Sequence, residues 1–164
     1  MRREATGVTL IELLVTISIM AILLAIATPS YNSTINGTRM SGEINDLLNS
    51  LNFARSEAVK RGLRVDVCPQ NGAVCGSGVT DWSSGWYVLL DSTSTQLQIL
   101  TLSTHTPSDT LTSTLTSYPY FTPTGYTFFT GTLSLHSNPD NAGIRRCIVF
   151  NAGSYTTVQG ASCP

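Results

Sequence analysis

A run of 20 largely apolar residues near the N-terminus, Val8 to Ala27, constrains this chain more than any other feature. As an α-helix the run would be about 30 Å long at roughly 1.5 Å per residue, which matches the hydrocarbon thickness of a bilayer. Arg2 and Arg3 precede the run, and the next basic residue is Arg39. The positive-inside rule therefore predicts that residues 1–7 face the cytoplasm and that the rest of the chain lies outside it.

Three kinds of N-terminal segment fit this run: a cleaved secretory signal peptide, a plain signal anchor, and an anchor that is processed ahead of its helix. Residues 25–27 (Ala-Ile-Ala) resemble a small-residue cleavage site, which favours a signal peptide. Two features oppose it. The run is longer than the hydrophobic region of roughly 7 to 15 residues that is usual in signal peptides, and the carboxylate of Glu12 lies inside it.

The carboxylate of Glu12 needs an explanation of its own. An ionised carboxylate in the apolar run costs about 2 to 3 kcal/mol or more, depending on its depth, so an anchor that carries one usually has a partner for it. The run contains no Lys, Arg or His. Cleavage between Gly7 and Val8 would create an α-amino group four residues before Glu12, on the same helix face. The amine of a neighbouring subunit could serve equally well.

The segment GVTLIEL at residues 7–13 closely resembles the prepilin cleavage and methylation motif of type IV pilins and type II secretion pseudopilins. It departs from the commoner pattern at Val8, where Phe or Met is more frequent. The resemblance implies cleavage by a prepilin peptidase after Gly7, N-methylation of Val8, and subunit assembly through Glu12, the fifth residue of the mature chain. Pro29 falls where many pilins have a helix-distorting proline, and it predicts a kink.

A second helical pattern follows the anchor. Gly62 is the expected C-cap of this helix, and Lys60, Arg61 and Arg64 gather around it, a placement that complements the helix dipole without any ligand. Charged and polar residues should lie mostly on the opposite, solvent-facing side: Glu43, Asp46, Asn49, Arg55, Glu57 and Lys60. The apolar residues, which recur at helical spacing, should form one buried face: Met40, Ile44, Leu47, Leu48, Leu51, Ala54, Ala58 and Val59.

Beyond Gly62 the pattern changes to short strands separated by Ser, Gly and Pro. The first predicted strand alternates apolar and charged residues and should be half-buried, whereas the second is a short apolar run that should be central. The last two strands read as a hairpin with a Gly-containing loop. The predicted strands are 63–67, 86–90, 97–102, 111–115, 126–129, 132–135, 146–150 and 154–159.

The four cysteines form an even set in a short chain with an export-like N-terminus, which predicts disulfides. Of the three possible pairings we expect Cys68 with Cys75 and Cys147 with Cys163, because each closes a short local loop. A metal site is the competing interpretation. The spacings contain no CxxC knuckle, and neither His105 nor His136 has a second ligand nearby, so no metal site is predicted.

These patterns predict an α+β fold, in which a long N-terminal transmembrane and stalk helix packs on a small antiparallel β-sheet domain, and the resemblance to prepilins implies that the fold is pilin-like. The expected parts are a prepilin leader at residues 1–7, a transmembrane and assembly helix at 8–35, and an extracytoplasmic globular domain at 36–164. The helix of the globular domain should extend to about residue 62.

Several segments beyond the anchor resemble the minor pilins of the FimT and FimU type and, less closely, the GspH-type pseudopilins. They are ARSEAVKRG at 54–62, Cys68-Pro69, Asp81-Trp82, Gly85-Trp86, 121–125 and the terminal hairpin. The resemblance implies a low-abundance subunit that helps to initiate or cap a pilus together with other minor and major pilins. It implies a bacterial inner-membrane anchor with a periplasmic domain and, after assembly, a place in a pilus at the cell surface. A type II secretion pseudopilin is the alternative.

No arrangement of residues predicts catalysis, and neither an enzymatic role nor a cofactor is expected. DNA binding is a further alternative, because some FimT-type proteins take up DNA through a Gly-Arg-x-Arg segment after the hairpin turn. Residues 153–156 of this chain read Gly-Ser-Tyr-Thr and lack both arginines. With a net charge of −1, only a local patch could bind DNA, and we expect weak binding or none. The candidate substitutes are Arg145, Arg146, Arg64 and Lys60, with Tyr155 as a possible stacking residue.

Overall fold

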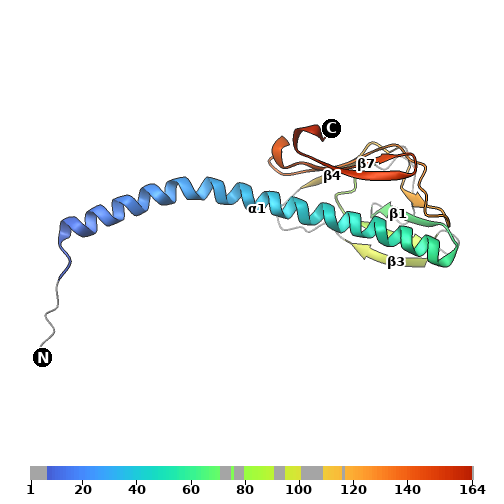
Figure 1. The fold of residues 1–164 in the computed structure, drawn as a ribbon, viewed down its shortest axis with the longest axis horizontal. Coiled ribbons are helices and arrows are strands. Elements are labelled where there is room, and N and C mark those ends of the chain that lie inside the picture. Colours follow the sequence, from blue (N-terminus) through green and yellow to red (C-terminus); the bar gives the residue numbers. More distant parts are fainter. Residues whose placement is uncertain are drawn as a thin grey trace, which may run out of the picture. The chain divides into compact units, whose positions relative to one another are not determined.

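The computed structural model describes residues 7–70, 75, 80–90, 95–100, 109–115 and 117–163, with only the backbone described at 27–30, 95, 96 and 98–100 (Figure 1). It confirms the predicted α+β class, with one long helix followed by antiparallel strands. The elements are α1 (Leu10–Arg61), β1 (Val65–Pro69), β2 (Trp86–Leu90), β3 (Thr95–Leu100), β4 (Thr110–Ser113), β5 (Tyr120–Phe121), β6 (Gly131–His136), η1 (Ala142–Ile144), β7 (Arg146–Asn151), β8 (Ser154–Gln159) and η2 (Gly160–Ser162).

The chain forms two compact units, residues 1–37 and residues 38–164, and α1 contributes to both. We call the second unit the head. In the first unit, the helical backbone of α1 continues without a break past residue 29. The kink expected at Pro29 stays a prediction.

The C-terminus of α1 is a glycine cap, as predicted. Gly62 adopts the left-handed conformation with φ 66°, and its N–H donates to the carbonyl of Ala58 at 3.0 Å. This single bond back to the last turn is the αL capping motif. Lys60 and Arg61 lie in the same turn and both pair with Glu57, at 3.5 Å and 2.5 Å. The glycine cap therefore ends the helix, and the positive charges of Lys60 and Arg61 lie at the negative end of the helix dipole.

The head part of α1 buries one face, at six of the eight predicted positions: Met40, Ile44, Leu47, Leu51, Ala54 and Ala58. Leu48 is half-buried, and the prediction for Val59 is wrong, because this side chain is 54% exposed. At about 100° per residue, Val59 lies a quarter-turn or more away from the stripe that ends with Ala58. Glu43 and Glu57, predicted to face solvent, are both buried, since their positions fall on or beside that stripe.

The strands form two four-stranded antiparallel sheets rather than the single small sheet that we expected. Sheet A has the order β3-β2-β1-β5, and sheet B has the order β4-β6-β7-β8. The predicted terminal hairpin is confirmed, with β7 and β8 paired from Arg146–Gln159 to Asn151–Ser154. Sequence patterns could not divide the strands between two sheets, because each short strand has the same alternation whichever sheet it joins.

Two strand predictions need correction. Residues 126–129 alternate as predicted, with Tyr126 and Phe128 exposed and Thr127 buried, but the segment belongs to neither sheet. The edge position beside β1 is occupied instead by Tyr120–Phe121. The strand β1 was expected to be half-buried, yet Asp66 is only 2% exposed, because β1 is flanked by β2 and β5 and the carboxylate pairs with Arg64.

The core of the head lies between α1 and the two sheets, and Trp82, Trp86, Phe121 and Phe150 are its largest fully buried side chains. The indole N–H of Trp86 donates to the hydroxyl of Ser50 on α1 at 2.9 Å, a bond that joins the helix to β2 inside the apolar core.

Two disulfides close local loops. Cys68 pairs with Cys75 and Cys147 with Cys163, with Cα–Cα distances of 5.4 Å and 5.7 Å. The pairing agrees with the one that loop length predicts. The second bridge joins β7 to the residue that follows η2, so it fixes the C-terminal residues onto sheet B.

We predict that Ser50→Ala lowers the free energy of unfolding of the head by about 1–3 kcal/mol, because the buried indole N–H of Trp86 would lose its acceptor. Denaturant unfolding of the full chain in detergent, followed by tryptophan fluorescence, measures the change. Ser56→Ala is the matched control: this exposed serine on the same helix donates only to the Phe53 carbonyl, so its loss should cost less than about 0.5 kcal/mol. Equal effects of the two variants would contradict the prediction.

Candidate functional site

The predicted processing site lies directly before the first turn of α1. Gly7, Val8 and Thr9 precede the helix, whereas residues 1–6 of the predicted leader lie outside the described residues. The backbone N–H of Glu12 donates to the Thr9 hydroxyl at 3.3 Å, and the N–H of Leu13 donates to the Thr9 carbonyl at 3.2 Å. Thr9 is therefore the N-cap of the helix, and Glu12 occupies the third helical position.

This arrangement was missed in the sequence, although its signal is visible there. Thr9 and Glu12 have the Thr-x-x-Glu spacing of a capping box, in which the acidic side chain also complements the positive end of the helix dipole. The negative charge of Glu12 therefore also lies where it stabilises the start of the helix. Its side chain is exposed, and it makes no ion pair with the residues that the structure describes.

The anchor part of α1 exposes its apolar side chains on all sides. Every residue from Val8 to Ile26 is exposed, and α1 is long and apolar enough to cross a membrane, with a mean hydropathy of 2.7 over its most apolar stretch. A soluble monomer rarely leaves so large an apolar surface in water. Cover by lipid or by other apolar helices would remove this surface from water, which fits a membrane anchor.

A cluster of three charged residues lies in the head on α1 and just before β4. The guanidinium of Arg39 pairs with Asp109 at 2.7 Å, and Asp109 also accepts the backbone N–H of Asn138 at 3.0 Å. Glu43 is one turn beyond Arg39 and is 5% exposed. Neither oxygen of its carboxylate has a hydrogen-bond partner among the described residues.

Burial is the main cause that raises the pKa of Glu43, from its ordinary value of 4.5 to about 7. The negative charge of Asp109 and, more weakly, that of Asp46 act in the same direction, and Arg39 opposes them. One arginine thus lies beside two buried carboxyl groups. Near neutral pH Glu43 can therefore lose its proton. The carboxylate that results is a buried negative charge without a hydrogen-bond partner among the described residues, which lowers the stability of the head.

Each of the four predicted DNA-contacting cations has partners within the head. Arg64 donates to Asp66 at 2.7 Å and lies 3.8 Å from the centroid of the Tyr120 ring. Lys60 pairs with Glu57 at 3.5 Å.

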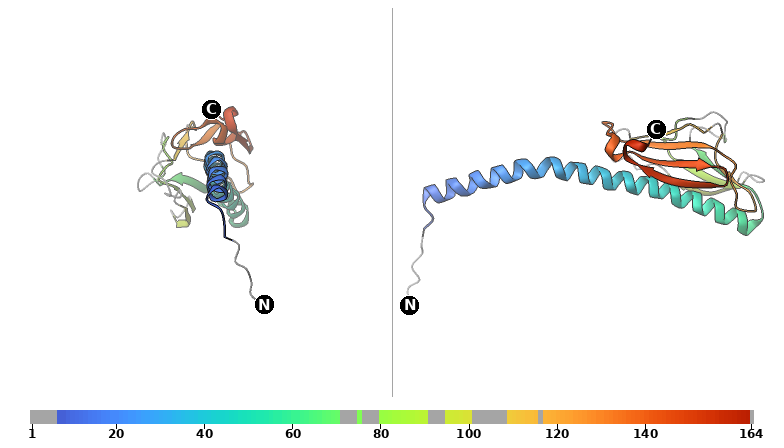
Figure 2. Two further views of the ribbon diagram at one scale, coloured as in Figure 1. Left: turned by 90° about the vertical axis from the view of Figure 1, so that its left-hand side faces the viewer. Right: turned by 45° about the horizontal axis from the view of Figure 1, so that its top comes forward.

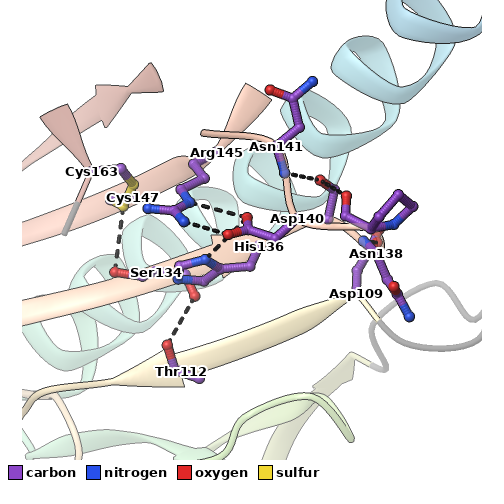
Figure 3. A network of polar contacts seen from close by, with 12 residues as sticks. Asp109, Thr112, Ser134, His136, Asn138, Asp140, Asn141, Arg145, Cys147 and Cys163 are labelled. Carbon is purple, nitrogen blue, oxygen red and sulfur yellow. Dashed lines mark hydrogen bonds and ion pairs between the residues drawn. A yellow bond between two sulfur atoms is a disulfide. The ribbon is translucent and has the colours of Figure 1, made fainter. Parts of the chain in front are cut away.

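The two arginines near β7 are held in the same way. Arg145 forms two hydrogen bonds with Asp140, which lower the pKa of that carboxyl, and Asp140 also contacts His136 at 3.5 Å. Figure 3 shows the Arg145 side chain turned back toward Asp140. Arg146 donates to the hydroxyl of Ser41 at 3.2 Å and to the Arg145 carbonyl at 2.9 Å.

The structure does not bring the four cations together. Arg146 contacts Ser41 near the start of the head part of α1, whereas Lys60 lies 19 residues further along the same helix. That separation is roughly 28 Å at ~1.5 Å per residue. Arg64 follows the C-terminus of α1 and belongs to the Lys60 end. The cations thus form two separate pairs rather than one patch.

Tyr155 is a packing residue. Its ring lies 6.1 Å from that of Phe121 and 5.8 Å from that of Phe150, and its hydroxyl donates to Asn52 on α1 at 2.6 Å. Burial raises the pKa of its phenol. The ring therefore packs against core aromatic side chains, and its hydroxyl is bonded to α1, so the ring is not presented for stacking on a base. Among the described residues, no group of three or more His, Cys, Asp or Glu side chains could hold a metal ion.

Comparison with known proteins gives two family matches. The family model described as type II transport protein GspH matches residues 43–154, which is more than half of the chain, and that of the prokaryotic N-terminal methylation motif matches residues 2–28. None of the curated proteins compared with the chain matches it.

Two crystal structures of the type IV minor pilin FimU from Pseudomonas aeruginosa (strain PAO1) have the same fold. The crystal form in space group P65 is 21% identical, with a TM-score of 0.54, and the match covers 76% of this chain and 96% of that one. The form in space group P21 is 18% identical, with a TM-score of 0.57, and the match covers 77% and 93%.

We predict that the head loses stability as the pH rises from about 4.5 to about 7. The folded state holds the proton of Glu43 in this window, whereas the unfolded chain has already released it, so ionisation favours unfolding. Glu43→Gln removes this penalty and should raise the free energy of unfolding at pH 8 by about 1–3 kcal/mol, with little change at pH 4.5. Unfolding of the full chain at several pH values measures both effects.

Asp46→Asn is the control for this prediction. Asp46 is an exposed carboxylate on the same helix, so its neutralisation should leave most of the pH dependence in place. A Glu43→Gln variant whose stability varies with pH as steeply as that of the parent chain would refute the assignment to Glu43.

Proposed function

The chain belongs to the family described as type II transport protein GspH, and on this premise we propose that it acts as a minor subunit of a type IV pilus that helps to initiate or cap the filament. The start of α1 carries this proposal. The apolar helix begins at Leu10, just after the Gly7-Val8 junction, is exposed through Ile26 and presents a carboxylate at Glu12. A plain anchor needs only the apolar surface, whereas a subunit that packs against other helices also has a use for the carboxylate.

In this proposal a prepilin peptidase removes residues 1–7 and the new amine of Val8 is methylated. The amine, of this subunit or of a neighbour, pairs with Glu12 and offsets the cost of placing that carboxylate among apolar helices. The anchor part of α1 serves first as a span of the bacterial inner membrane, with the head in the periplasm. It then serves as a packing surface against other minor and major pilins in a pilus at the cell surface.

DNA uptake is the less favoured function. Non-specific binding to a duplex depends on several cations that can neutralise phosphates at once. Arg145, Arg146, Arg64 and Lys60 lie at two separate ends of the head, and each already contacts an acidic, hydroxyl, carbonyl or aromatic group. Phosphate would have to compete with these internal partners.

A pseudopilin of a type II secretion system is the second candidate, and the GspH family match is the observation that favours it. The same processing and the same use of Glu12 apply to both roles, because both depend on packing of the anchor helices. Deletion of the gene distinguishes them: loss of surface pili with normal protein secretion supports the pilus, and the reverse result supports the secretion system.

We predict that the mature protein begins at Val8 and carries one added methyl group on its α-amine. Intact-mass analysis of the chain isolated from membranes measures both changes at once. Gly7→Ala is expected to yield chain that retains its leader, since the residue before the cut contributes to recognition. A mature N-terminus at Thr28 would instead identify an ordinary secretory signal peptide and exclude the pilin role.

We further predict that Glu12→Gln inserts into the membrane normally but is depleted about tenfold or more from sheared pilus fractions. Glutamine keeps the capping box, which accepts either Glu or Gln, but it lacks the charge that pairs with an amine. The control is Thr9→Ala, which loses the cap and keeps the carboxylate. The amount of Thr9→Ala in sheared pilus fractions should therefore be closer to that of the parent chain than the amount of Glu12→Gln is. Normal incorporation of Glu12→Gln would refute the role of the charge, and depletion of Thr9→Ala alone would assign the effect to capping.

A further inference from the structure

Among the residues that the structure describes, no strand pairs with the outer edge of β8, which is one margin of sheet B. The strand is the last in the order β4-β6-β7-β8, and its six residues pair with β7 without a bulge. In Figure 2 the strand, coloured red, lies at the margin of its sheet.

The register shows which backbone groups of β8 face outward. In an antiparallel ladder, residues alternate between pairs that exchange hydrogen bonds and pairs that do not. The N–H of Gly160 donates to the Arg145 carbonyl at 3.0 Å, so Arg145 and Gly160 form a hydrogen-bonded pair. Cys147 and Val158 lie opposite each other two residues further along the same register, so they form the next hydrogen-bonded pair. Residues 154, 156 and 158 therefore bond to β7, whereas Tyr155, Thr157 and Gln159 direct their N–H and C=O groups away from it.

This edge lacks the features by which proteins usually prevent strand addition. The residues Ser154–Gln159 include no charged side chain and no proline, and four of the six are Ser, Thr or Val. The opposite edge of sheet B is closed: Trp82 N–H donates to the Leu111 carbonyl at 2.7 Å, and Ser113 N–H donates to the Thr80 carbonyl at 2.7 Å. In sheet A, the edge strand β3 is interrupted by a register shift opposite Val88 and Leu89.

A groove of about 350 Å³ lies beside this edge and gives the added strand room. Its two walls come from α1 and from β7–β8. The hydrogen bond from Arg146 to Ser41 crosses from one wall to the other. The lining is polar or small apart from Ile44, and it contains no acidic group: Ser41, Ile44, Asn45, Arg146, Cys147, Thr157, Val158 and Gln159. It suits an uncharged extended segment with small side chains facing α1.

We propose that the outer edge of β8 accepts a strand from a neighbouring pilin subunit, which extends sheet B across the subunit boundary. The inference rests on the proposed function, because it requires that the anchor helices of neighbouring subunits hold their heads close together. Each backbone hydrogen bond of such a ladder contributes only about 1 kcal/mol, so a free peptide would bind weakly. Subunits whose anchor helices already pack together hold their heads at high effective concentration, and a short ladder then suffices.

The test replaces Thr157, whose N–H points outward. Thr157→Pro removes that donor and places a ring where the added strand would lie, yet leaves the β7–β8 bonds intact. Thr157→Ala is the matched control, because it loses the side chain and keeps the N–H. Thr157→Lys is a second edge-blocking variant that retains the backbone, in case proline disturbs folding. Thermal unfolding of each full-length variant in detergent shows whether the head remains folded.

The readout is a photo-crosslinking amino acid in place of Thr156, carried by the full chain in the bacterium that produces it. We expect a crosslink to an uncharged segment of another pilin subunit, identified by peptide mass spectrometry. The crosslink should fall about tenfold in Thr157→Pro and Thr157→Lys and change less than about twofold in Thr157→Ala.

An undiminished crosslink in a folded Thr157→Pro or Thr157→Lys variant overturns the proposal. So does a crosslink only to a second copy of this chain, or the absence of any crosslink from a chain that co-isolates with pilins. In these cases the role as a pilus subunit stands. A chain that neither loses its leader nor co-isolates with any pilin would refute the proposed function, and the strand addition with it.

Discussion

The head depends on the burial of one face of α1. Both sheets share a single apolar core with the helix, in which Leu51 and Ala54 are fully buried and the Ser50–Trp86 hydrogen bond provides a polar link. A sheet needs another element against which to bury its apolar face, and α1 packs in the same core as the apolar side chains of both sheets. The same helix carries the exposed apolar surface of residues 8–26. One element thus serves two environments, and its side chains change character where the head begins.

Much of this fold can be predicted because its signals are local. The bounds of β2 and β8 match their predicted ranges, since each is an alternating or apolar run between turn residues. Most of the failures needed tertiary information, whereas the exposure of Val59 follows from helical geometry alone. Residues 126–129 have the alternation of a strand but belong to neither sheet, and the Thr127 carbonyl accepts the N–H of Gly153 in the hairpin turn, at 2.8 Å. Glu43 and Glu57 are buried although charged, because their places on the helix wheel outweigh their polarity and, for Glu57, because Lys60 and Arg61 supply partners.

The candidate site divides in the same way. The processing motif could be found from sequence because it is contiguous, and its geometry around Thr9 follows from nearest neighbours along the chain. The proposed DNA residues could not be assessed from sequence, since their availability depends on partners far away, such as Ser41 for Arg146. The edge of β8 carries no recognisable motif. Its openness becomes visible only when the order of strands and the register of the last hairpin are known.

The N-cap at Thr9 has a consequence for the order of events during maturation. Because the helix starts after the Gly7-Val8 junction, the proposed cleavage site lies in non-helical backbone that a protease can engage without first unwinding a turn. Precursor and processed chain would share the same helix start, so the leader could be lost without refolding of the anchor. The conformational state that enters assembly would then be present already in the precursor, and cleavage would change its charge rather than its shape.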